Sequence, residues 1–283
     1  MTSAQRGSRG RHDGGMGERA AIDDSDAPRT RASLADDLRA LGVEPGGVLL
    51  VHSSLSSLGW VCGGPVAVVQ ALLDVLGPSS TLVVPTHTGN NSDPSDWANP
   101  PIPQDWWPTV REQMPVFDPQ ITPSNGMGVV PEIVRTLPGA ARSAHPQSSF
   151  AALGPQAEQI TAGHALVSGM GEESPLGRLY DLDASILLLG TGHANNSSFH
   201  LAEYRVPDPR RHRTGAAVST PTGRQWIAYE DVELDSGDFE ALGVAFDTAG
   251  HTRLGRVGSA ESRLFGQRDA VDFAVHWFPR HRG

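Results

Sequence analysis

Several features that are scarce or missing in this 283-residue sequence narrow the classes of protein to which it can belong. It contains a single cysteine, Cys62, so an internal disulfide is impossible, which fits a reducing cytoplasm. No apolar run approaches the roughly 18–20 residues that a membrane-spanning helix needs, and no hydrophobic signal segment begins the chain. We therefore expect a cytoplasmic protein with no membrane partner.

Two further absences concern lysine and the phosphate-binding loops. All 22 basic residues are arginine, a bias that suggests a GC-rich genome and carries no chemical information. Neither GxxxxGK nor GxGxxG occurs, so the sequence shows none of the glycine-rich loops of the common nucleotide-binding folds.

The charge is unevenly distributed. The formal net charge is −10, and residues 1–30 hold five arginines and five acidic residues, so the excess negative charge lies on the rest of the chain. An acidic surface repels nucleic acid and attracts cationic ligands. The charge therefore argues against a nucleic-acid partner and slightly favours a polycationic substrate.

The order of predicted elements indicates an α/β fold. Residues 1–29 are poor in large apolar residues, and we expect this tail to be disordered. Residues 30–283 then form one large domain, which begins with an amphipathic helix at 30–41. Apolar strands at 48–51 and 81–84 enclose a helix at 66–76, as in a right-handed crossover unit of a parallel or mixed sheet flanked by helices.

The segment 85–123 is too long for an ordinary connection and is crowded with proline, asparagine, aspartate and tryptophan. It is either a loop on the substrate side of the protein or a structural loop that buries Trp97, Trp106 and Trp107. Later segments predict helices at 126–135 and 155–161, a hairpin at 216–226 and a closing helix that carries Val271, Val275 and Phe278 on one face.

The stretch 186–205 is the centre of the prediction. A short apolar run at 186–189 predicts a buried strand, and Gly190 and Gly192 permit a sharp turn into a polar loop. A helix then begins near Ser198 and places His200 and Glu203 on one face. Ligands of α/β sheets bind where such a glycine turn follows a strand.

This stretch resembles the aminoglycoside 3-N-acetyltransferases, whose pattern is an apolar strand, Gly-x-Gly-His, a polar loop and Thr/Ser-x-His-x-Ala-Glu. Four other segments agree and follow in the expected order. The matching segments are HSSL at 52–55, RSAHP at 142–146, SFAA at 149–152, SPLGRL at 174–179, GTGH at 190–193 and SFHLAE at 198–203. The resemblance implies the antibiotic N-acetyltransferase fold, which differs from that of the general acetyltransferase superfamily.

The implied activity is transfer of acetyl from acetyl-CoA to the 3-amino group of a 2-deoxystreptamine aminoglycoside, which confers antibiotic resistance. A substrate ammonium must lose a proton before it attacks, and histidine is the best base near neutral pH. We expect His200 to be this base. The resemblance places its partner acid at Asp231 or Glu233, with Glu230 possible if the alignment shifts, and Glu203 is an alternative orienting acid.

The resemblance also implies where the two substrates bind. Acetyl-CoA would bind near His52, Ser53, Ser54 and Leu55, and near Arg142 and Ser143, since Arg142 can pair with a phosphate and backbone amides beside Ser54 can polarise the thioester carbonyl. The polycationic aminoglycoside would need several carboxylates. Candidates for that role are Asp93, Asp96, Glu203, Asp231 and Glu233.

Three alternatives remain open at this stage. A related acyltransferase could act on a different amine, and a protein of the same fold could bind drug or coenzyme without turnover. A metal-dependent hydrolase is a weaker alternative, because its candidate ligands match no short zinc-binding spacing. Those ligands are His52, His87, His145, His193 and His200. We expect no metal, no catalytic role for Cys62, and either a monomer or a homodimer.

Overall fold

The computed structural model describes residues 19, 21–23 and 25–282. Most of the residues for which the sequence predicts disorder, 1–18, 20 and 24, lie outside the described part. Residues 25–29 of the same segment pair with the domain. Arg29 forms a parallel bridge with Val61, and Ser25 Oγ accepts a hydrogen bond from the backbone N–H of Trp60 at 2.9 Å.

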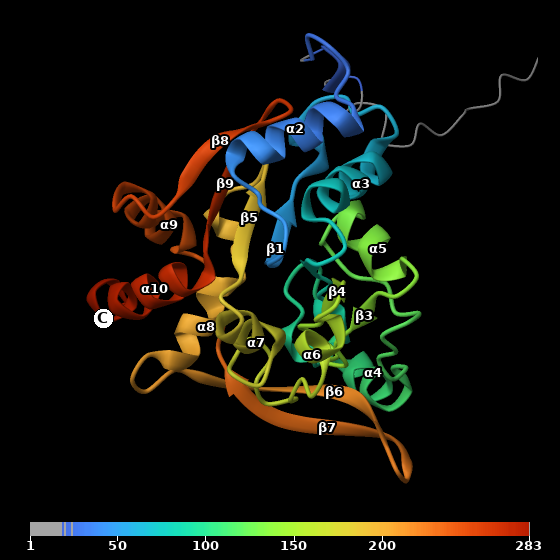
Figure 1. Cartoon of the computed structure of the whole chain (residues 1–283). Helices are drawn as coiled ribbons and strands as arrows, with labels where there is room; N and C mark the ends of the chain where they lie inside the picture. The colour runs from blue at the N-terminus through green and yellow to red at the C-terminus, as the bar shows by residue number, and fades with distance from the viewer. Residues whose placement is uncertain (1–18, 20, 24, 283) are drawn as a thin grey trace, which may run out of the picture.

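A seven-stranded mixed sheet forms the centre of the domain, in the order β3-β4-β2-β1-β5-β9-β8 (Figure 1). Its middle strands β2 (Thr81–Pro85), β1 (Val48–Ser53) and β5 (Ser185–Leu189) are parallel. On one side β4 (Phe150–Leu153) and β3 (Ala141–Arg142) pair antiparallel, and on the other β9 (Ala260–Gly266) and β8 (Arg253–Val257) do the same. The predicted mixed α/β fold is confirmed.

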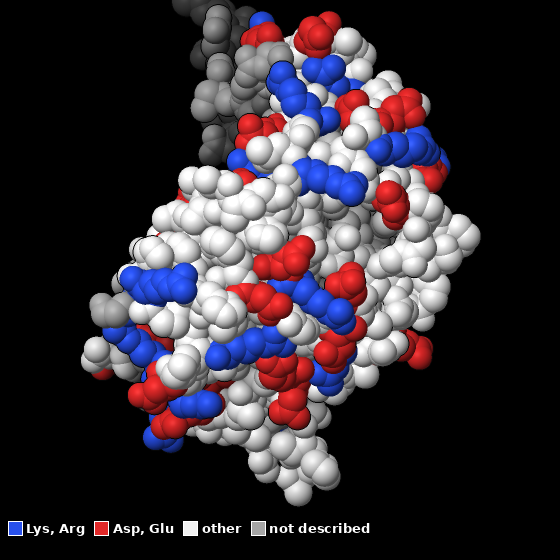
Figure 2. Space-filling view, turned by 60° about the vertical axis from the view of Figure 1, so that its left-hand side comes forward, with Lys and Arg blue, Asp and Glu red and all other residues white. Residues whose placement is uncertain are grey.

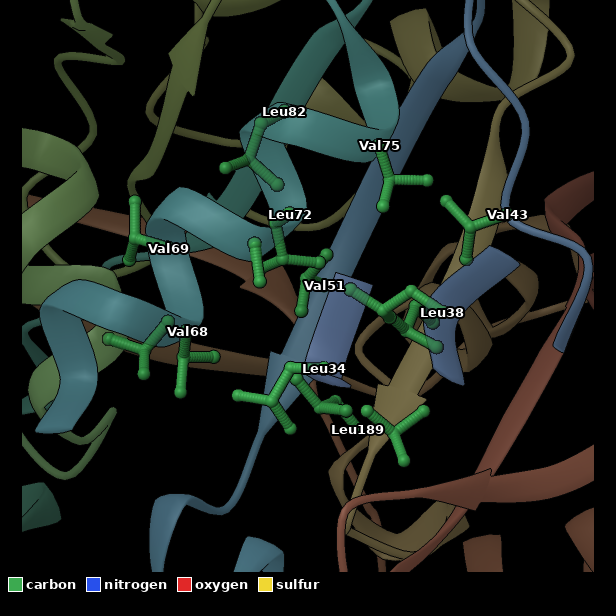
Figure 3. Close-up of a cluster of buried hydrophobic side chains, with 14 of the residues drawn as sticks. Leu34, Leu38, Val43, Val51, Val68, Val69, Leu72, Val75, Leu82 and Leu189 are labelled. Atoms are coloured by element: carbon green, nitrogen blue, oxygen red, sulfur yellow. The ribbon is translucent and has the colours of Figure 1, made fainter. Parts of the chain in front are cut away.

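The parallel strands are mostly apolar because helices cover both faces of the sheet. Alternate residues of β1 enter different cores: Leu49 and Val51 face one, and Val48 and Leu50 face the other. The first core contains α2 (Arg31–Leu41), α3 (Gly64–Leu76) and α5 (Val129–Thr136). Figure 3 shows Leu34 and Leu38 meeting Val68, Leu72 and the strand residues Val51 and Leu189 in this core.

The second core lies under the remaining helices. It is packed by α6 (Ala157–Thr161), α7 (Pro175–Asp181), α8 (Ser198–Arg205), α9 (Phe239–Thr248) and α10 (Gln267–His281). Helix α7, helix α9 and the strands β3, β4, β8 and β9 were not predicted. The predicted helices at 30–41 and 66–76 correspond to α2 and α3, and Thr30 caps α2 by accepting from the backbone N–H of Ser33.

Two segments extend beyond this layered core. The hairpin of β6 (Arg211–Thr220) and β7 (Gly223–Val232) is longer than the predicted 216–226 and runs below α4 and α6 to α8 in Figure 1. The segment 85–123 contains the short helix α4 (Trp107–Gln113) and three 3-10 turns, and Trp106 within it is 59% exposed.

The acidic excess does not produce a uniformly negative surface. Figure 2 shows arginine and acidic side chains interleaved on one face of the molecule. Within the described residues, no helix is long and apolar enough to cross a membrane.

Candidate active site

The three parallel strands end at one edge of the sheet, and histidines follow two of them. His52 lies at the end of β1, His87 follows β2, and the turn after β5 leads into α8, which carries His200. Gly190 makes this turn with a φ of 68°, and a Cβ atom there would lie 2.9 Å from Cβ of Ala260. All three histidines line one cavity of about 210 Å³.

His200 forms a hydrogen bond with a carboxylate of its own helix. Its Nδ1 lies 2.6 Å from Oε2 of Glu203, three residues later, and the two side chains are 15% and 4% exposed. The other oxygen of Glu203 accepts from Nη1 of Arg282 at 2.5 Å and from the backbone N–H of Asp235 at 3.1 Å. Because a carboxylate accepts only, Nδ1 of His200 carries the proton and Nε2 remains the basic nitrogen.

The other two histidines of the cavity are kept neutral. Burial, with a smaller contribution from the charge of His200, lowers the pKa of His52 to about 3. Burial also lowers the pKa of His87 to about 3, and Nε2 of His87 lies 3.5 Å from Oγ of Ser197. Of the three, His200 has the carboxylate partner that an imidazole needs to accept a proton.

A second cavity of about 770 Å³ adjoins the histidine cavity. The two share Ser53, Gly126, Met127, Thr191 and Asn195 as lining residues. The larger one is further lined by Ser54, Leu55, Trp60 and Val129, and by Ala21 from the segment before α2. A cleft of this size with a mostly apolar lining is typical of small-molecule sites. The predicted coenzyme residues Ser53, Ser54 and Leu55 therefore lie together beside His200.

The backbone amide of Ser54 is already occupied. It donates to the carbonyl of Leu189 at 2.9 Å, so this amide cannot also bind a thioester oxygen. The Ser54 hydroxyl lies 2.8 Å from that of Ser57 at the wall of the cleft.

The other two predicted coenzyme residues, Arg142 and Ser143, form their hydrogen bonds within the protein. The guanidinium of Arg142 donates to the hydroxyl and carbonyl oxygens of Thr86, to the Ser149 hydroxyl and to the carbonyl of Thr122. The buried Ser143 hydroxyl accepts from the backbone N–H of Phe150 and lies 2.9 Å from Nδ1 of His164. Neither residue lines the two cavities described above, so the expected phosphate contact of Arg142 lacks geometric support.

The predicted acids are separated as well. The carboxylate that contacts His200 is Glu203, the alternative, and not Asp231 or Glu233. Asp231 is buried and accepts from the Tyr204 hydroxyl and from the backbone N–H groups of Gly169 and Val232. Glu233 is exposed and lines a third cavity of about 670 Å³, whose lining also includes Glu203.

The two remaining acids tie the segment 85–123 together. Asp93 forms a bidentate ion pair with Arg111, with N–O distances of 2.9 and 2.7 Å. Asp96 accepts from the Thr214 hydroxyl of β6 at 2.6 Å. Arg224 of β7 donates to the carbonyls of Met114 and Arg111 at 2.7 and 2.6 Å. The hairpin thus braces this segment from outside.

The remaining candidate metal ligands point to different places. The rings of His145 and His164 lie 4.7 Å apart and are tilted by 31°, and Nε2 of His193 lies 3.0 Å from Oδ1 of Asp247. Among the described residues, no group of three or more His, Cys, Asp or Glu side chains is arranged to hold a metal ion. Cys62 is exposed.

Sequence reasoning missed Arg282 and Phe239. The Phe239 ring lies 4.7 Å from that of His200, and Arg282 reaches Glu203 from 79 positions further along the chain. Neither residue belongs to a matching segment, and no local pattern pointed to them.

Comparison with known proteins identifies the family. The family model for aminoglycoside 3-N-acetyltransferase matches residues 50–279. The chain belongs to this family. This confirms the resemblance inferred from the sequence, and membership of the family makes the protein an acyltransferase.

Among relatives of this acetyltransferase is the SPbeta prophage-derived aminoglycoside N(3')-acetyltransferase-like protein YokD of Bacillus subtilis. It is 44% identical over 258 residues, which cover 91% of this chain and 95% of the relative. Aminoglycoside N(3)-acetyltransferase VII of Streptomyces paromomycinus is 36% identical, with coverage of 95% and 98%.

Solved structures agree with the fold. The crystal structure of YokD from Bacillus subtilis superposes with a TM-score of 0.91 at 43% identity and covers 93% of this chain and 98% of that one. AAC-IIIb, solved as a binary complex with CoASH, has a TM-score of 0.80 at 34% identity, with coverage of 90% and 97%. AAC-VIa bound to sisomicin has a TM-score of 0.80 at 29% identity, with coverage of 91% and 100%.

Proposed function

We propose that this protein transfers an acetyl group from acetyl-CoA to the 3-amino group of 2-deoxystreptamine aminoglycosides, and so confers antibiotic resistance. Transfer is direct, within a ternary complex, and His200 is the general base. The observation that carries the proposal is the His200–Glu203 pair at 2.6 Å, because its histidine lines a cavity that shares a wall with a cleft of about 770 Å³.

The wall that the two cavities share suggests how the substrates meet. The cleft beside Ser54 suits the long, mostly uncharged arm of coenzyme A, and AAC-IIIb was solved with CoASH. When bound there, acetyl-CoA supplies an activated acyl group as a thioester. The amine then approaches through the histidine cavity, and AAC-VIa was solved with sisomicin.

The proton path follows from the tautomer. Nδ1 of His200 donates to Glu203, so Nε2 takes the proton that the substrate ammonium loses as its nitrogen forms the amide bond. The buried Glu203 carboxylate stabilises the resulting imidazolium. The thiolate of coenzyme A leaves as the carbon–sulfur bond breaks, and the proton held by His200 is available to it or to water.

The decisive variant is His200→Ala. Loss of a general base lowers kcat by roughly 10²–10⁴-fold, while the Kd for coenzyme A changes little. Thiol release with acetyl-CoA and gentamicin or neomycin measures turnover, and mass spectrometry locates the new acetyl group. His276→Ala, which removes an exposed histidine of α10, is the matched control.

Full turnover in a folded His200→Ala protein would overturn the mechanism. A panel that includes non-aminoglycoside amines separates the substrate classes, because acetylation of a different amine alone would assign the protein to a related N-acyltransferase.

A further inference from the structure

We propose that Arg282 is a positioning residue for the acetyl transfer: its guanidinium holds Glu203 in the orientation that fixes His200. The inference rests on the proposed function, since it concerns the same base. It assigns a role in catalysis to a residue outside every segment that resembles the family pattern.

Arg282 is itself held rigidly. Its Nε and Nη2 donate to the two carboxylate oxygens of Asp238 at 2.6 and 2.5 Å, and its guanidinium carbon lies 3.8 Å from the centre of the Phe278 ring. Because the guanidinium is planar, these contacts restrict its rotation and fix the direction of its remaining N–H donors. Its Nη1 points at Oε1 of Glu203 at 2.5 Å.

This contact determines which oxygen of Glu203 faces the base. Oε1 accepts from Arg282 and from the backbone N–H of Asp235, so Oε2 is the oxygen left for Nδ1 of His200. Glu203 is only 4% exposed, so water cannot replace a lost donor freely. Without Arg282, Oε1 would keep the longer hydrogen bond from the backbone N–H of Asp235, so the carboxylate would be held less firmly against rotation.

Arg282 also fixes the loop that borders the histidine cavity. Its Nη2 donates to the carbonyl of Asp235 at 2.5 Å, and the next residue, Ser236, lines the cavity beside His200. The loop therefore has both its Asp235 carbonyl and its Asp238 carboxylate bound to one guanidinium. Loss of Arg282 would loosen one wall of the site together with Glu203.

The sign of the electrostatic effect follows from the neighbouring charges. Several titratable and charged groups surround the pair. They are Arg282, Asp235 and Asp238 on the loop side, Asp208, Arg210 and Glu233 in the cavity that Glu203 also lines, Tyr204 on α8, and the neutral His52 and His87 at the strand ends. Of the two cations, Arg282 is the one that donates a hydrogen bond to Glu203. Its removal leaves the charge of Glu203 less compensated and stabilises the protonated imidazole, so activity is lost at a higher pH than in the unmodified protein.

The test compares Arg282→Gln and Arg282→Lys with Arg280→Gln, an exposed arginine two positions earlier on the same helix. We expect Arg282→Gln to lower kcat roughly 10- to 100-fold, with the KM for acetyl-CoA within about threefold and the acid limb of the pH profile moved upward. Arg282→Lys keeps the positive charge but lacks the several donors of the planar guanidinium. Its kcat should lie between those of Arg282→Gln and the unmodified protein. Arg280→Gln should match the unmodified protein.

A double variant distinguishes positioning from general damage. If Arg282 acts through Glu203, Arg282→Gln should reduce kcat by less than about twofold in a Glu203→Gln background. Additive losses in the double variant, or an Arg282→Gln protein with unchanged kcat and pH profile, would overturn the inference. If the Gln variant does not fold, the Lys variant provides the same comparison.

A measurement independent of turnover separates this inference from the proposed function. In protein labelled with ¹⁵N-histidine, the His200 signals, assigned by their absence from His200→Gln, report the protonation of Nε2. They should titrate at higher pH in Arg282→Gln than in the unmodified protein. An unchanged titration refutes the role of Arg282 even if acetylation is observed, and a shift supports it even if no aminoglycoside is acetylated.

Discussion

Mild acid should destabilise this fold at a pH where most carboxylates are still ionised, because four of its histidines are kept neutral by burial. Burial is the first cause in each case. It lowers the pKa values of His52, His87 and His164 to about 3 and that of His145 to about 4, from an ordinary value of 6.5. Since the folded-state values lie below the unfolded one, the unfolded chain binds more protons. Stability is therefore fully present above about pH 6.5 and falls as the pH drops toward the folded values.

The size of the effect follows from the same shifts. At pH 5 an unfolded histidine gains about 2 kcal/mol from protonation that its buried counterpart cannot gain. The two most buried, His52 and His145, thus contribute about 4 kcal/mol. His87 and His164 are half-buried and add at most about the same again, less what solvent screens. A total of about 4–8 kcal/mol is comparable to the whole stability of a typical domain.

Urea unfolding followed by tryptophan fluorescence at pH 7, 6 and 5 measures this loss directly. His145→Gln keeps an acceptor for the backbone N–H groups of Gln147 and Ser148 but does not titrate, so it should recover about 2 kcal/mol of the loss. His212→Gln, at an exposed position, should recover none. An unfolding free energy that stays constant from pH 7 to pH 5 would refute the reasoning.

Two further predictions concern residues whose role the structure makes plain. Arg142→Ala removes the donor to the carbonyl of Thr122 and leaves the carbonyl of Thr86 with the Ser149 hydroxyl alone, so it should cost about 3 kcal/mol in denaturant unfolding. The Kd for coenzyme A, by calorimetry on folded protein, should stay within about twofold. A tenfold weaker Kd would return Arg142 to the coenzyme site. Gly243→Ala places a methyl group inside the buried His193 ring and should also cost about 3 kcal/mol, and an unchanged thermal midpoint would contradict that packing.

The parts of the fold that the sequence predicted are those encoded locally. The apolar runs of β1, β2 and β5 mark strands that are buried on both faces, and Thr30 and Gly42 mark both ends of α2. Such signals need no knowledge of the neighbours in space. The same holds for His200 and Glu203, whose spacing of three residues places them on one face of α8.

Elements that depend on distant partners were missed. Strand β8 is mostly exposed and carries two arginines, Arg253 and Arg256, so it lacks the apolar alternation of a predictable strand. Helix α9 contains Gly243, which weakens a helix signal, yet a glycine is needed there because His193 packs against the helix.

The site shows the same limit. The sequence predicts that Arg142 contacts the coenzyme and that Asp231 and Glu233 serve the base or the substrate. Residue type alone does not tell whether a charged side chain faces a ligand or the protein interior. Asp231 is buried, and its oxygens accept hydrogen bonds from the Tyr204 hydroxyl and the Gly169 N–H. The guanidinium of Arg142 donates to backbone carbonyls instead of to a ligand. These partners come from other segments of the chain and emerge only on folding.

The bracing of the segment 85–123 by the hairpin has a consequence for how substrate preference could evolve. Thr214 and Arg224 hold that segment by Asp96 and by two carbonyls, so a change of length in either element would break contacts made by the other. The two should therefore diversify as a pair among natural sequences. An engineer who grafts one of them onto another scaffold should transplant its companion with it.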